Sequence, residues 1–182
     1  MKSENIPIDL KTKSLIKNKL RIYLNDKDIL DVILFGSIVK GKIMPEDIDV
    51  ALITDKEIKA DINGFHITTL RLQEFFLSPP SIVHTLLREG YSLKNDIFFS
   101  ENYKFLSRVL FVYELKNLNP SVKVKIVTLL RGKGKENGLV RENGGEWLAN
   151  QVFIMPLKAD NLLERFLINF KINYKKYFLL MH

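Results

Sequence analysis

Two short groups of residues in this sequence are of types that could carry out phosphate chemistry. An apolar run, Val32–Phe35, ends at Gly36 and Ser37, and a second apolar run begins with Asp47 and Asp49. A strand that ends at Gly-Ser and turns into a short helix exposes backbone N–H groups, which attract anions such as phosphate. Two carboxylates at positions i and i+2 of a strand project to one face, where their repulsion favours a divalent cation. The segment therefore predicts a phosphate-binding turn beside a metal site.

Each residue of the turn has a physical role in this interpretation. Gly36 tolerates unusual φ values and lets the backbone approach a ligand closely. Ser37 can cap the helix and donate its hydroxyl to a phosphate oxygen, and Gly41 can end the helix. Lys40 and Lys42 are further candidates for phosphate contact, with simple solvation as the alternative. Because Mg²⁺ is held by one or two carboxylates plus substrate phosphates, we expect Mg²⁺ or Mn²⁺ at the acidic pair.

The same segment resembles the signature of the DNA polymerase β-like nucleotidyltransferases. Residues 36–41 read Gly-Ser-x-x-x-Gly, and Pro45 precedes the acidic pair, as in the small "minimal" nucleotidyltransferases of archaea and bacteria. The resemblance covers roughly residues 10–100. It implies transfer of a nucleoside monophosphate from an NTP, with ATP favoured, to a hydroxyl acceptor, with release of pyrophosphate. It also implies that Gly36 and Ser37 contact the triphosphate and that Asp47 and Asp49 hold two metal ions.

The family also has a third carboxylate, on the strand that follows the acidic pair. That strand is expected over residues 64–72 and contains no Asp or Glu. His66 falls where the acid is expected, and a neutral imidazole can be a metal ligand or a base. Asp61 is a second candidate if the strand begins earlier. The third alternative is a degenerate site that binds nucleotide without efficient turnover.

Composition limits the class of protein. The chain has 182 residues, 46% of them hydrophobic, which is typical of a packed globular protein. The absence of cysteine excludes disulfides, zinc–thiolate sites and thiol catalysis. We find no apolar signal segment at the N-terminus and no apolar run of membrane-spanning length. These features favour a cytoplasmic location without a membrane partner.

The positive charge is concentrated in the second half of the chain. Residues 1–100 contain 14 Lys+Arg and 14 Asp+Glu, whereas residues 101–182 contain 14 and 7. A basic half favours RNA or DNA as a partner, with a solvated lysine surface as the alternative. Residues 131–145 contain five glycines and four basic residues. Lys133, Lys135 and Arg141 are therefore candidate contacts to a nucleic-acid backbone, unless the segment only forms two surface turns.

Periodicity and punctuation predict the elements that position these residues. We expect helices over residues 9–25, 82–90, 101–118, 120–131 and 160–170, and strands on both sides of the Gly-Ser turn and over 64–72 and 151–156. The predicted fold class is α+β. Residues 1–100 would form a nucleotidyltransferase-type domain, a small mixed sheet with flanking helices. Residues 101–118 would form a connecting helix, and residues 119–182 a small basic α+β module, with a winged arrangement as an option.

The leading hypothesis is a metal-dependent nucleotidyltransferase whose acceptor the sequence does not identify. The alternative is a catalytically inactive nucleotidyltransferase-like module that binds nucleic acid through its basic second half. A third option is an antitoxin-type interaction subunit that binds a partner protein.

Overall fold

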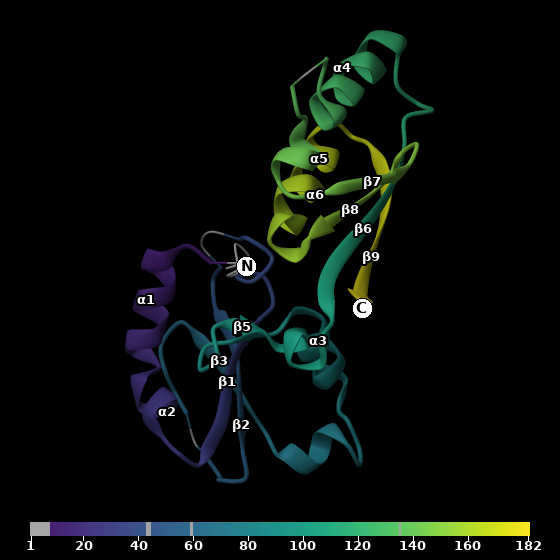
Figure 1. Cartoon of the computed structure of the whole chain (residues 1–182). Helices are drawn as coiled ribbons and strands as arrows, with labels where there is room; N and C mark the ends of the chain where they lie inside the picture. The colour runs from purple at the N-terminus through teal and green to yellow at the C-terminus, as the bar shows by residue number, and fades with distance from the viewer. Residues whose placement is uncertain (1–7, 43–44, 59, 135) are drawn as a thin grey trace. The chain divides into compact units, whose positions relative to one another are not determined.

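A computed structural model describes residues 8–42, 45–58, 60–134 and 136–182, and the chain divides into two compact units (Figure 1). The first unit is Met1–Leu106 with His182, and the second is Ser107–Met181. Each unit combines helices with a β-sheet, so the expected α+β class is confirmed. Across the described ranges, no helix combines the length and apolar character needed to cross a membrane.

The first unit contains a mixed sheet, as the sequence predicts, and this sheet has five strands. Its strands are β1 (Ile29–Phe35), β2 (Ile48–Thr54), β3 (Phe65–Leu70), β4 (Tyr91–Ser92) and β5 (Ile97–Phe98). The strand order is β3-β2-β1-β4-β5. β2 and β3 run parallel, and the other neighbouring pairs run antiparallel. The strand expected over 64–72 is therefore confirmed as β3.

Helices cover both faces of this sheet. α1 (Leu10–Lys19) and α2 (Arg21–Asn25) lie on one face and α3 (Ser81–Glu89) on the other (Figure 1). The helix expected over 9–25 is thus two helices, and the Asp9 carboxylate caps the first by accepting two backbone hydrogen bonds. Short 3-10 helices, η1 (Leu72–Phe75) and η2 (Phe99–Tyr103), complete the unit.

The core of the first unit is formed by the central strands. Residues 32–34 of β1 and 50–52 of β2 are fully buried, so both faces of these strands are covered. On the α3 side, Ile33, Ile53 and Leu86 form a buried cluster. The partly buried rings of Phe75 and Phe99 pack against this cluster. Because β1 and β2 are packed on both faces, the positions of their ends, where the candidate site residues lie, are fixed.

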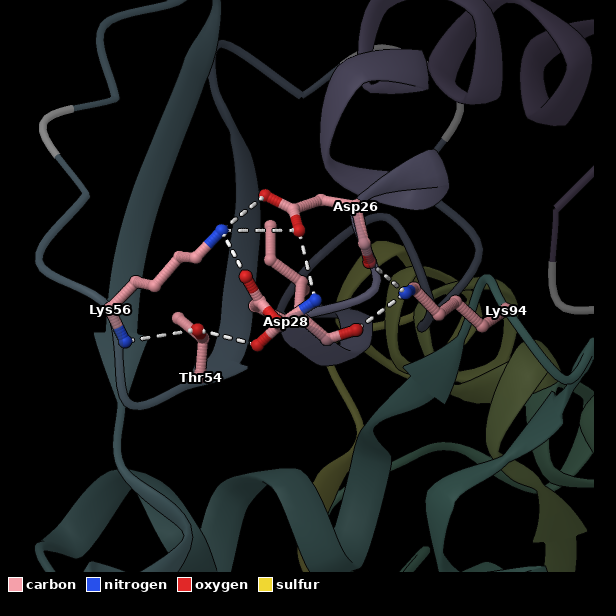
Figure 2. Close-up of polar contacts among 6 residues, drawn as sticks. Asp26, Asp28, Thr54, Lys56 and Lys94 are labelled. Carbon is pink, nitrogen blue, oxygen red and sulfur yellow. Dashed lines mark hydrogen bonds and ion pairs between the residues drawn. The ribbon is translucent and has the colours of Figure 1, made fainter.

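A polar network holds the beginning of β1 (Figure 2). Lys94 donates its ammonium to the carbonyl oxygens of Asp26, at 2.9 Å, and of Ile29. On the other side, Lys56 forms ion pairs with the carboxylates of Asp26 and Asp28. Because carbonyls and carboxylates of the α2–β1 connection are bound from two directions, this connection is fixed to the sheet.

The second unit has its own four-stranded sheet in the order β7-β8-β6-β9. The strands are β6 (Leu106–Glu114), β7 (Glu146–Ala149), β8 (Val152–Pro156) and β9 (Asn173–Met181), and β9 lies at an edge. The helices are α4 (Pro120–Arg131), α5 (Leu139–Glu142) and α6 (Asp160–Asn169), with a 3-10 turn η3 (Leu157–Ala159) before α6. The helices expected over 120–131 and 160–170 and the strand over 151–156 are confirmed.

The connecting helix expected over residues 101–118 is wrong. This part of the chain forms the end of η2 and then β6. Residues of β6 alternate strictly between buried and partly or fully exposed, and the buried positions are Ser107, Val109, Phe111 and Tyr113. A period of two is the pattern of a strand with one buried face. The expectation of a helix from residue 101 depended on Ser100 as an N-cap, and the alternation of β6 outweighs that local preference.

Candidate functional site

The ends of three neighbouring strands meet at one edge of the first sheet. β1 is antiparallel to β2, so Phe35 at the end of β1 pairs with Asp49 at the beginning of β2. β2 is parallel to β3, so Asp49 also pairs with His66 near the beginning of β3. The strand register therefore places the Gly36 turn, Asp49 and His66 next to one another.

Gly36 lies directly against the Asp49 carboxylate. Its φ is +74°, a backbone conformation that favours glycine. A Cβ atom at position 36 would lie 3.3 Å from Cγ of Asp49 and would collide with Oδ2. Glycine is therefore needed at position 36 for two reasons: the positive φ, and the lack of space for a side chain beside the Asp49 carboxylate.

Asp49 and His66 contact each other through their side chains. Nδ1 of His66 lies 3.3 Å from Oδ1 of Asp49. The His66 side chain is 70% exposed and that of Asp49 is 32% exposed, so solvent reaches both. When Nδ1 carries the proton it donates to the carboxylate, which leaves Nε2 as an acceptor toward solvent. The pair can therefore bind a cation or take up a proton at the surface of the unit.

Asp47 and Asp61 are not part of this contact. The strand begins at Ile48, so Asp47 lies one residue outside β2, is exposed, and is not held beside Asp49 by strand alternation. Asp61 is also exposed and lies before β3. Over the described ranges, no three or more His, Cys, Asp or Glu side chains form a group able to hold a metal ion. Of the four candidate ligands, only Asp49 and His66 are brought together.

The short helix expected after the Gly-Ser pair is absent. Residues 36–41 form successive turns, in which the N–H of Gly41 donates to Ile38 at 3.3 Å and that of Lys42 donates to Ser37 at 3.0 Å. Gly36 and Gly41 both have positive φ, so neither is itself helical, and only four residues lie between them. Ser37 is half-buried within these turns. Without a helix dipole, any anion binding here depends on the N–H groups of the turns themselves.

Lys40 contacts a buried acid that the sequence analysis did not identify. Its ammonium lies 2.9 Å from Oε2 of Glu89, the last residue of α3, which is 2% exposed. Arg88 is a second, more distant cation at 3.9 Å. Lys40 is therefore used to hold the turn against α3, while Lys42 follows the turn and is half-buried. No local sequence pattern distinguishes Glu89 from a surface helix residue.

The basic candidates of the second unit lie around a compact glycine-rich segment. Gly132, with φ of +90°, has its backbone against Glu136 and Gly138, so the segment closes on itself. Lys133 is exposed and lines an open pocket of about 440 Å³ that also contains Glu136 and Glu142. Arg141 on α5 is exposed. Lys135 lies outside the described residues.

Comparison of the chain with protein-family models, with curated proteins and with solved structures finds no match.

Proposed function

We propose that the chain is a metal-dependent nucleotidyltransferase. The observation that supports this proposal is the convergence of Gly36, Asp49 and His66 at one edge of the first sheet. In this function Gly36 and Ser37 bind the triphosphate of an NTP, with ATP favoured. Asp49 holds Mg²⁺ or Mn²⁺ when the bound nucleotide supplies further oxygen ligands, and Asp47, exposed one residue before β2, turns toward the same ion as the second carboxylate.

The donor set fits a hard cation, because Asp49 offers carboxylate oxygens that are open to solvent. The metal would neutralise charge on the phosphates during displacement of pyrophosphate. His66 accepts the proton of the attacking hydroxyl at Nε2 while Nδ1 remains bound to Asp49. The bond from the α-phosphorus to the bridging oxygen breaks, and the bond to the acceptor oxygen forms.

The test is transfer of label from α-labelled NTPs to RNA and protein acceptors in the presence of Mg²⁺ or Mn²⁺. We expect Asp49→Asn to lower transfer by about two orders of magnitude, as for loss of one group that stabilises transition-state charge. Asp55→Asn, which removes an exposed carboxylate next to the far end of β2, is the matched control and should keep wild-type activity. Absence of transfer to every acceptor, with retained RNA binding, would contradict the proposal.

We keep a nucleic-acid-binding module without catalysis as the second candidate. The observation that favours it is the lack of a grouped third ligand among the described residues. The surplus of seven positive charges over residues 101–182 supplies an electrostatic footprint for a polyanion. Binding of RNA that weakens with salt, and weakens further in Lys133→Ala/Arg141→Ala, would support this candidate. Unchanged binding in that double variant would remove these two residues as contacts.

A further inference from the structure

A second candidate site lies in the first unit, near the opposite end of β1 from the Gly36 turn. A pocket of about 240 Å³ lies there among β1, β2, η1 and η2, and its lining includes Asp31, Phe75, Phe76, Phe99 and Tyr103. Asp31 and Gly36 are five residues apart along an extended strand, which separates them by roughly 16 Å. The pocket is therefore distinct from the convergence of Gly36, Asp49 and His66.

Four of the residues that line the pocket are aromatic. The ring centroids of Phe75 and Phe99 are 5.9 Å apart, with 52° between the ring planes. Those of Phe99 and Tyr103 are 5.8 Å apart at 71°, an edge-to-face arrangement. Phe76 is 73% exposed and Tyr103 is 45% exposed, although burial of such side chains is the usual outcome of folding. Because the three rings are inclined to one another, a ligand in the pocket would meet aromatic surface from more than one direction.

A carboxylate lies among these rings. Asp31 is only 7% exposed, yet it lines the pocket. Its Oδ1 accepts hydrogen bonds at 2.8 Å from the Val32 N–H and from the Ser92 hydroxyl. These bonds fix the orientation of the side chain. Lys94 lowers the pKa of Asp31 through its charge and its backbone N–H, while its ammonium is bound to the carbonyls of Asp26 and Ile29 (Figure 2).

We propose that this pocket binds a small organic cation, an alkylammonium or quaternary ammonium group, with Asp31 as its counter-ion and Phe75, Phe99 and Tyr103 as its aromatic walls. Aromatic faces around a cation are the general solution for recognising ammonium groups, because the ring quadrupole attracts charge while the apolar body displaces water. An anion would meet the Asp31 carboxylate and is disfavoured. The volume is below the roughly 300–1,000 Å³ of sites for drug-sized ligands, so the ligand is small.

The chemistry of the pocket distinguishes a cation from a neutral apolar guest. A purely hydrophobic pocket gains nothing from a buried carboxylate, since removal of a charged group from water is unfavourable. The neutral donors of Val32 and Ser92 bind only Oδ1, so a cationic ligand in the pocket would supply counter-charge that these two bonds do not. The proposal does not depend on nucleotidyl transfer, because no residue of the pocket belongs to the Gly36 edge.

The test is titration of the full chain with choline and with 3,3-dimethyl-1-butanol, its uncharged isostere, followed by ¹H–¹³C NMR of the aromatic rings. We expect choline to shift the signals of Phe75, Phe99 and Tyr103 with a dissociation constant in the millimolar range. We expect the alcohol to bind at least about tenfold more weakly. Equal affinities for the two probes, or no shift by choline at concentrations roughly tenfold above 1 mM, would overturn the proposal.

Two variants localise the effect. Asp31→Asn retains an acceptor for Val32 and Ser92 but removes the charge, so choline binding should fall to the level of the alcohol. Phe99→Leu removes one wall and should weaken choline by about threefold to tenfold. Asp49→Asn is the control at the other end of the strand and should leave choline affinity unchanged. If Asp31→Asn fails to fold, the comparison of choline with its isostere on the wild type still decides. Undiminished choline binding in a folded Asp31→Asn variant would contradict the assignment.

Discussion

The backbone of Gly36 and the carboxylate of Asp49 are so close that position 36 has no room for a side chain. A substitution there has two costs, the positive φ and the collision with Asp49. Gly64 offers a control for the first cost alone, because its φ is +80° and a Cβ there would meet no atom within 4 Å. The two glycines thus separate backbone strain from loss of space.

We expect Gly36→Ala to lower the free energy of unfolding by about 2–4 kcal/mol and Gly64→Ala by about 1 kcal/mol. The difference between the two losses of unfolding free energy measures the cost of displacing the Asp49 carboxylate. Urea unfolding of the wild type and both variants provides the comparison. Equal costs for the two substitutions would show that Asp49 moves aside freely.

Burial, the largest influence on Asp31, raises its pKa above the usual value despite the hydrogen bonds from Ser92 and Val32. Because the folded protein binds the Asp31 proton more tightly than the unfolded chain does, protonated Asp31 makes its full contribution to stability below the unfolded-state pKa of about 4. This contribution is lost as the pH rises through the folded-state pKa. The ionised carboxylate therefore costs stability at neutral pH, as expected for a group retained for binding.

Asp31→Asn should consequently be more stable than the wild type at pH 7, and this advantage should shrink as the pH falls toward about 4. Urea unfolding at several pH values measures the difference. If the stability of Asp31→Asn relative to the wild type were lower at pH 7 than at pH 4, the pKa of Asp31 would not be raised in the folded protein.

Among the elements, the turn after β1 is held by α3 through a buried ion pair. Loss of the lysine leaves a buried carboxylate without its closest cation, whereas loss of the acid leaves a lysine that can reach solvent. We expect Lys40→Met to cost about 3 kcal/mol, near the lower limit for such a loss because Arg88 lies 3.9 Å away. Glu89→Gln should cost less.

Thermal or urea unfolding checks this asymmetry, with Lys42→Met as the matched control on the same turn. The control should change stability by less than about 0.5 kcal/mol. A larger cost for Glu89→Gln than for Lys40→Met would contradict this account, because it would mean that the ammonium, rather than the carboxylate, lacks an alternative partner.

Local signals predict most elements of this fold. Apolar runs locate β1 and β2, Gly90 locates the end of α3, and Asn119 with Pro120 locates the beginning of α4. The errors arise where one signal was weighed against another. Ser100 favoured a helix at a position where the alternation from Ser107 onward specifies β6. Between two glycines of positive φ, residues 37–40 form turns in place of the short helix expected there.

The candidate site is less predictable than the fold, because it depends on contacts between distant residues. Strand register brings His66 to Asp49, and the role of His66 as a third ligand stays a prediction. The exclusion of Asp47 from β2 depends on where the strand begins, which periodicity defines only within a few residues. Asp31 and Glu89 gave no signal, since burial of a single acid is a tertiary property.

At the scale of the whole molecule, each unit has its own sheet and its own buried residues. The single tryptophan of the sequence, Trp147, lies on β7 and therefore reports on the second unit alone. Far-ultraviolet circular dichroism reports on both units. The two probes together can show whether a change in one unit is felt in the other.

We expect Gly36→Ala to shift the circular dichroism transition to lower urea while the Trp147 fluorescence transition stays within error of the wild type. The reason is that the substitution removes stability from a core that does not contain Trp147. A parallel shift of both transitions would show that the units unfold as one cooperative structure.

The position of β9 at the end of its strand order has a consequence for the behaviour of the protein at high concentration. A nine-residue edge strand presents backbone groups on which another chain can add a strand, and lysines normally discourage such addition. Lys176 is occupied by Asp160 and Glu164, so exposed Lys175 is the charge available for this protection. The following residues, Tyr177–Met181, are uncharged. Self-association and fibril formation are therefore expected to begin at this end of β9 when salt screens Lys175.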